Sequence, residues 1–114
     1  MLSVKNRFHG HSAVRRVYRI GRQTRGQLFS AHVNKGDKVR YTKVAVVVSK
    51  KVHKSAVKRN RIRRRIYECV RHRLDSVTTP AEIVITVYKL EVIDLSYDQM
   101  VRSVDEILKK AGLI

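Results

Sequence analysis

The fold is decided by a β-branched stretch, VRYTKVAVVV, at residues 39–48. Its first half alternates polar and apolar side chains, and its second half is apolar throughout, which predicts a strand covered on both faces where it ends. A second apolar run, EIVITVY at residues 82–88, predicts another buried strand. Between them lies a long basic segment with helical periodicity. A strand, a helix and a strand in this order predict a crossover connection within one sheet.

The basic segment at residues 50–73 carries eleven lysines and arginines and only one acid, Glu68. Ser55 is a suitable N-cap for its helix, and Pro80 prevents the helix from continuing into the next strand. Apolar residues recur at helical spacing and predict the buried stripe. This stripe comprises Val57, Ile62, Ile66, Cys69, Val70 and Leu74.

Two further elements are predicted before the first buried strand. Residues 13–20 have an apolar stripe with arginines on the opposite face, which predicts a short helix with Ser12 as N-cap and Gly21 as its stop. The segment 27–33 predicts a strand, and the turn residues at 34–37 suggest that it pairs with 39–48 as an antiparallel hairpin.

The last helix has the clearest boundaries. Ser96 and Gln99 have the spacing of a capping box, and Gly112 follows the final turn as a stop. Its predicted buried stripe comprises Tyr97, Met100, Val101, Val104, Ile107, Leu108 and Ala111. Since no linker divides the chain, we expect a single α+β domain over residues 1–114, in the order α-β-β-β-α-β-α, with a four-stranded mixed sheet and helices packed on it.

The charge of the chain is large and uneven. The net charge is +17 over 114 residues, but residues 1–74 hold 22 lysines and arginines against two acids, whereas residues 75–114 are slightly acidic. A domain that tolerates this self-repulsion usually binds a polyanion. Nucleic acid is the first candidate and an anionic membrane surface is the second.

The sequence offers no constellation for catalysis by the protein itself. It contains no Ser/His/Asp pattern, glycine-rich phosphate loop or HExxH motif. His9 and His11 have no carboxylate or thiol near them in sequence, so no metal site is expected. The single cysteine, Cys69, rules out an intrachain disulfide and fits a reducing compartment. Residues 1–7 lack the apolar stretch of a secretory signal, so a cytoplasmic location is expected.

Arginine dominates the basic segment, and its planar guanidinium suits bidentate contact with phosphate. Lys54, Ser55 and the amides at the start of the helix add a second anion-binding feature. Asn60 is a poor helix former in the middle of this run. It either hydrogen-bonds a sugar, phosphate or base edge, or faces water as an ordinary surface residue.

The segment SKK at residues 49–51, followed by SAVKRNRIRR at 55–64, resembles the signature of the bacterial ribonuclease P protein subunit. The upstream Arg7-Phe8, Val17-Tyr18 and Gly21 also resemble that family's N-terminal pattern, and its length and element order match nearly the whole chain. The resemblance implies a protein that assists a catalytic RNA in cutting the 5′ leader from precursor tRNA. The RNA holds the active site and its Mg²⁺ ions, and the protein is part of this endoribonuclease without catalytic residues of its own. It also implies a left-handed crossover at the basic helix, against the general right-handed rule.

The resemblance further implies two sets of binding residues. One set would face the catalytic RNA and comprises Lys50, Lys51, Lys54, Lys58, Arg59, Asn60, Arg61, Arg63 and Arg64. The other would line a leader-binding cleft between the first helix and the sheet and comprises Val14, Tyr18, Phe29 and His32. Val14 and His32 stand where the family commonly has aromatic residues, so weaker stacking on unpaired bases is expected. Phe29 fits the cleft and the hydrophobic core equally well.

Two other classes of protein share some of these features. A structural ribosomal protein would have the same charge and size, but would have no effect on tRNA processing. A membrane-active cationic protein would bind vesicles in preference to RNA, and the mixed α+β pattern argues against it.

Overall fold

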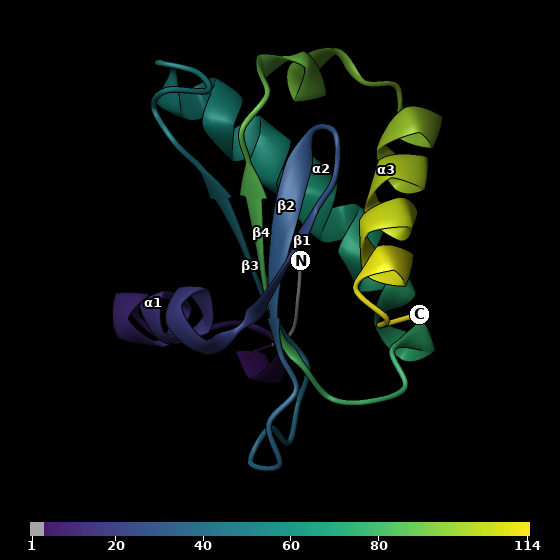
Figure 1. Cartoon of the computed structure of the whole chain (residues 1–114). Coiled ribbons are helices and arrows are strands. Elements are labelled where there is room, and N and C mark those ends of the chain that lie inside the picture. Colours follow the sequence, from purple (N-terminus) through teal and green to yellow (C-terminus); the bar gives the residue numbers. More distant parts are fainter. Residues whose placement is uncertain (1–3) are drawn as a thin grey trace.

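The computed structural model describes residues 4–114 and shows an α+β fold (Figure 1). Residues 1–3 lie outside the described residues. They are part of the segment 1–7 that is expected to lack a secretory signal. The helices are α1 (His11–Ile20), α2 (Ala56–Arg73) and α3 (Tyr97–Lys110), with short 3₁₀ turns η1 (Val4–Asn6), η2 (Leu74–Ser76) and η3 (Leu90–Asp94). The strands are β1 (Arg22–Arg25), β2 (Phe29–Asn34), β3 (Lys43–Val48) and β4 (Glu82–Val87). None of the helices within residues 4–114 is long and apolar enough to cross a membrane.

The four strands form one mixed sheet in the order β1-β2-β4-β3. β4 is parallel to β3 and antiparallel to β2, so the predicted crossover through the basic helix is confirmed. Ile83, Val84 and Ile85 of β4 are all fully buried. A strand that is apolar on both faces is stable only where strands flank it and helices cover it, which explains its central position.

The predicted hairpin between residues 27–33 and 39–48 is wrong. β2 pairs with β4 on one side and with β1 on the other, and β4 separates it from β3. Residues 39–42 are not part of a strand, so the connection from β2 to β3 is too long and polar for a tight hairpin. The actual hairpin joins β1 and β2, and the polar sequence RQTR of β1 gave no alternating signal.

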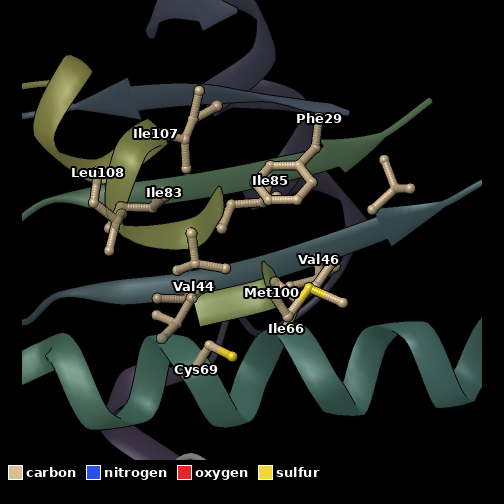
Figure 2. Close-up of a cluster of buried hydrophobic side chains, with 14 of the residues drawn as sticks. Phe29, Val44, Val46, Ile66, Cys69, Ile83, Ile85, Met100, Ile107 and Leu108 are labelled. Atoms are coloured by element: carbon tan, nitrogen blue, oxygen red, sulfur yellow. The ribbon is translucent and has the colours of Figure 1, made fainter. Parts of the chain in front are cut away.

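The hydrophobic core lies between one face of the sheet and the helices α2 and α3. Figure 2 shows Phe29, Val46 and Ile85 of the strands facing Ile66 of α2 and Ile107 of α3. The alternate strand residues face the other way, toward α1, which lies on the opposite side of the sheet (Figure 1). The two faces of the sheet therefore carry different helices and different surfaces.

The helix ends confirm two of the three predicted N-caps. The Ser55 hydroxyl accepts a hydrogen bond from the Lys58 amide, and Ser96 and Gln99 form the complete capping box. Ser12, by contrast, lies inside α1, because that helix begins at His11 after Gly10, whose φ of 90° suits only glycine.

Two residues assigned to buried stripes are exposed. Val57 is 76% exposed and Tyr97 is 61% exposed. Both lie in the first turn of their helices, where the packing of α2 and α3 against the sheet has not yet begun. Periodicity alone cannot show where such contact starts, so the prediction of burial is wrong for these two residues.

Gly21 is required by close packing and not by backbone torsion. Its φ is −75°, which any residue adopts, but a Cβ built on it would lie 2.5 Å from the Val17 carbonyl oxygen and 3.2 Å from backbone atoms of Val33. Its amide donates to that same Val17 carbonyl at 2.8 Å. This glycine thus lets the end of α1 approach β2.

We expect Gly21→Ala to lower the free energy of unfolding by about 2 kcal/mol, because the added methyl group meets backbone atoms that cannot move aside. Urea unfolding of the purified protein measures this. Gly36→Ala is the matched control, since its Cβ would meet nothing closer than 3.6 Å, and it should change stability by less than about 0.5 kcal/mol. Equal stability of the two variants would contradict the packing role of Gly21.

Candidate nucleic-acid interface

Six of the nine residues predicted to bind catalytic RNA are exposed cations. They lie in the turn after β3 and along the outer side of α2. Within the described part of the chain, their side chains make no hydrogen bond and no ion pair. The six are Lys50, Lys51, Lys54, Lys58, Arg61 and Arg64. Their charges are therefore available to an external anion.

The other three predicted residues are partly buried and bonded within the protein. Arg59 donates to the carbonyls of His53 and Lys54 at 2.8 and 2.9 Å, which fixes the turn before the helix. The Arg63 guanidinium donates to the side-chain oxygen of Asn60. The structure thus places all nine residues in one region, but it gives Arg59, Asn60 and Arg63 internal partners that the sequence did not reveal.

The remaining arginines of the basic segment hold α2 against the acidic C-terminal part of the chain. Arg65 donates to the carbonyls of Ile93 and Leu95. Arg73 pairs with Asp105 of α3 through two hydrogen bonds, the longer of them 2.7 Å, and this contact raises the pKa of Arg73. The acidic surface of α3 thus offsets part of the repulsion on α2.

Glu68, the single acid of the segment, is also engaged. It forms an ion pair with Arg71 at 2.5 Å, and the same carboxylate lies 3.3 Å from Nε2 of His72. The hydrogen bond from Arg71 lowers the pKa of Glu68, so the carboxylate stays ionised at neutral pH. The exposed cations nearby still outnumber it.

The start of α2 has fewer free amides than its position suggests. The Lys58 amide donates to the Ser55 hydroxyl at 3.3 Å, and the Ser55 amide donates to Nδ1 of His53 at 3.0 Å. The anion site predicted at Lys54 and Ser55 therefore depends mainly on the Lys54 ammonium and the helix dipole.

A second group of predicted residues meets on the other face of the sheet. The Tyr18 hydroxyl of α1 lies 2.5 Å from the Thr86 hydroxyl of β4. The Tyr18 ring meets the His32 ring edge-on, with centroids 4.8 Å apart and an interplanar angle of 68°. Val14 is partly exposed one turn earlier on α1. Tyr18 and His32 are thus brought into contact, with Val14 on the same side of the helix.

Phe29 does not belong to this group. It is 2% exposed and packs in the core on the α2 and α3 side of the sheet. Since side chains alternate along β2, Phe29 and His32 must point to opposite faces. The cleft assignment of Phe29 is therefore corrected to the core alternative.

Glu82, which no sequence motif singled out, fixes α1 on the sheet. Its carboxylate accepts from Arg16 of α1 at 3.1 Å and from the Asn34 side-chain amide of β2 at 2.7 Å. An acid within an otherwise apolar strand of a basic protein was the available signal for such a role.

His32 is a partly buried titratable group of this face. Its Nδ1 atom is buried, and no hydrogen-bond partner for it exists within the described residues. Burial lowers the pKa of His32 below its usual value of 6.5. The imidazole is therefore neutral at pH 7 and presents an uncharged ring beside Tyr18.

Comparisons with known proteins agree on one family. The family model described as Ribonuclease P matches residues 2–112. A ribonuclease P protein component from Pseudanabaena sp. is 32% identical over 114 residues, which cover all of this chain and 97% of the relative. Another from Clostridioides difficile is 29% identical over 90% of this chain and 88% of its own length.

Solved structures show the same fold. The ribonuclease P protein of Staphylococcus aureus superimposes with a TM-score of 0.83 at 22% identity, covering 95% of this chain and 96% of that one. The protein from Thermotoga maritima gives a TM-score of 0.74 at 18% identity, covering 84% and 88%.

The lowered pKa of His32 predicts how the stability of the folded protein depends on pH. Because its folded pKa is lowered, the unfolded chain takes up a proton first as the pH falls through 6.5, so acid selectively stabilises the unfolded state. We expect wild-type protein to lose more stability between pH 7.5 and pH 5 than His32→Phe, which cannot titrate. Thermal unfolding measures the loss, and an NMR titration of His32 should show a midpoint below 6.5.

The control for this experiment is His9→Gln, since His9 is exposed. This variant should keep the wild-type pH dependence. A His32 midpoint at or above 6.5, or a pH dependence unchanged in His32→Phe, would contradict the burial argument.

Proposed function

The chain belongs to the ribonuclease P protein family, and we propose that it is the subunit that binds the catalytic RNA and promotes removal of the 5′ leader from precursor tRNA. The observation that carries this role is the set of six exposed, unpaired cations on α2 and the preceding turn. In this proposal the cations screen the repulsion between two polyanions, the catalytic RNA and its substrate.

The internally bonded residues have a supporting role in this proposal. The hydrogen bonds of Arg59 to the carbonyls of His53 and Lys54 hold Lys54 in position relative to α2. The bond from Arg63 to Asn60 aligns the middle of the helix. Each guanidinium has five N–H donors, so Arg59 and Arg63 can also contact a phosphate or a base edge without giving up these bonds.

The leader of the substrate is assigned to the surface between α1 and the sheet. Tyr18 provides an aromatic face beside the neutral His32 ring and the partly exposed Val14. Single-stranded RNA commonly stacks on such rings. Because Phe29 lies in the core, Tyr18 is the only tyrosine or phenylalanine left among the four residues predicted for the cleft, so we expect modest leader affinity.

Bond cleavage is assigned to the RNA. In this proposal the RNA also holds the Mg²⁺ ions that cleavage requires. No chemical step is therefore assigned to a side chain of this protein. The location that fits this role is the cytoplasm, where precursor tRNA is processed.

We expect the protein to raise the rate at which its cognate catalytic RNA cleaves precursor tRNA at low Mg²⁺ concentration, because bound cations replace part of the Mg²⁺ that screens the RNA. Single-turnover cleavage with and without protein measures this. High Mg²⁺ is the control condition, where the two rates should converge. Equal rates at low Mg²⁺ would refute the proposed function.

The exposed cations also predict a salt dependence. Arg61→Ala and Arg64→Ala should each reduce the slope of log affinity against log salt for the catalytic RNA by about 1, if each residue neutralises one phosphate. Arg102→Ala on α3 is the matched control, since Arg102 is also exposed but lies on the acidic half of the chain. Filter binding over a range of salt concentrations gives the slopes. An unchanged slope in both α2 variants would remove these residues from the interface.

A further inference from the structure

Tyr97 borders an open pocket between α2 and α3. It is the first residue of α3 and is 61% exposed. The pocket has a volume of about 330 Å³ and is lined by Arg64, Arg65, Glu68, Cys69, Tyr97 and Met100. This volume is at the small end of the range for ligand sites. Neither core packing nor helix capping requires an aromatic ring at this position.

The backbone that carries Tyr97 is held firmly. The adjacent Ser96 forms the capping box with Gln99, with hydrogen bonds of 2.9 and 3.2 Å. The Arg65 guanidinium donates to the carbonyl of Leu95, two residues before Tyr97. A ring on a fixed backbone loses little conformational entropy when it binds a partner.

The walls of the pocket differ in chemistry. Cys69 and Met100 are buried and provide an apolar floor, and Figure 2 shows both among the core side chains. Burial raises the pKa of the Cys69 thiol, so the floor stays uncharged. Arg64 is exposed and has no partner among the described residues, whereas the Glu68 carboxylate is ion-paired with Arg71. An apolar floor, an aromatic wall and a free guanidinium suit a flat, polar-edged ring attached to an anion.

The pocket adjoins the cationic surface of α2. Val57, Arg61 and Arg64 follow one another at spacings of four and three residues, so they form one stripe along the helix. Val57 is 76% exposed within this stripe. A ligand on the stripe therefore meets both apolar and cationic groups. A nucleotide chain matches both, because its bases and sugars can pack on apolar groups and its phosphates can pair with cations.

We propose that Tyr97 and this pocket bind an unpaired nucleobase of RNA, with the adjoining phosphates on Arg61 and Arg64. The inference rests on the proposed function and adds a stacking residue to it, on the face of the sheet opposite Tyr18. The RNA can be the catalytic RNA or the precursor tRNA, since both contain unpaired nucleotides.

The experiment measures the affinity of the full chain for catalytic RNA and, separately, for precursor tRNA with a single-stranded leader. Tyr97→Ala should weaken binding to one of the two by about 5- to 100-fold, the range for loss of one stacked base. Tyr97→Phe should stay within about twofold of wild type, because the ring alone provides the stacking. The RNA whose affinity falls is the source of the base.

A matched control is Tyr41→Ala. Tyr41 is 53% exposed and lies in the connection between β2 and β3, away from the pocket. This variant should bind both RNAs within about twofold of wild type. The salt slope is a second readout, since loss of stacking should weaken binding without changing the slope, whereas Arg64→Ala should flatten it.

Several outcomes would overturn the inference. If wild type binds the catalytic RNA and Tyr97→Ala binds both RNAs equally well, the pocket is not a base site, although the proposed function stands. A Tyr97→Ala variant that loses affinity together with thermal stability, with Tyr97→Phe losing both as well, indicates a structural residue. A change in self-association with unaltered RNA affinity indicates a contact between copies of this chain. Failure of wild type to bind the catalytic RNA overturns both proposals.

Discussion

The structure depends on the burial of both faces of β4. Ile83 and Ile85 point into the core under α2 and α3, while Val84 points toward α1 and is also fully buried. Full burial of one β-branched or leucine-like side chain contributes about 2 kcal/mol, so leaving either face uncovered would be costly. This requirement places strands on both sides of β4 and helices on both faces. It thereby creates two separate surfaces, one around α1 and the other on the outer side of α2.

The second constraint is the repulsion among cations on α2. Like charges in neighbouring turns destabilise a helix by a few tenths of a kcal/mol per pair. The chain opposes this with the buried residues Ile62, Ile66 and Val70, and with arginines turned inward to carbonyls or to Asp105. Because these arginines are bonded within the protein, the cations that remain outside are concentrated on one side. The division into arginines that are bonded within the protein and arginines that are exposed therefore determines which side of α2 is cationic.

The sequence predicted those features that depend on local patterns. The helix α2, its cap at Ser55, the capping box at Ser96 and the parallel crossover into β4 all follow from periodicity and short motifs. The pairing of β2 could not be predicted in this way. Strand pairing depends on which strand must be central, and this is a property of the whole sheet. β1 was missed because RQTR is a polar edge strand whose stability comes from its neighbour. The alternatives for Phe29 were resolved by its burial in the core on the α2 and α3 side of the sheet, which the sequence pattern of one strand does not show.

The candidate site was predictable as a region and less so residue by residue. A run of basic residues predicts that an anion binds. Which of these cations are free and which are bonded within the protein depends on carbonyls and acids that are distant in sequence, such as Leu95 and Asp105. The two wrong predictions of burial also bear on the site. Periodicity placed Val57 and Tyr97 in buried stripes, and their exposure gives the cationic surface apolar and aromatic groups. Since charge alone attracts any polyanion, groups of this kind are what a basic surface needs to favour an RNA with unpaired bases at defined positions. The opposite placement of Tyr18, across the sheet, would then keep two RNA segments apart while a single scaffold fixes their relative position.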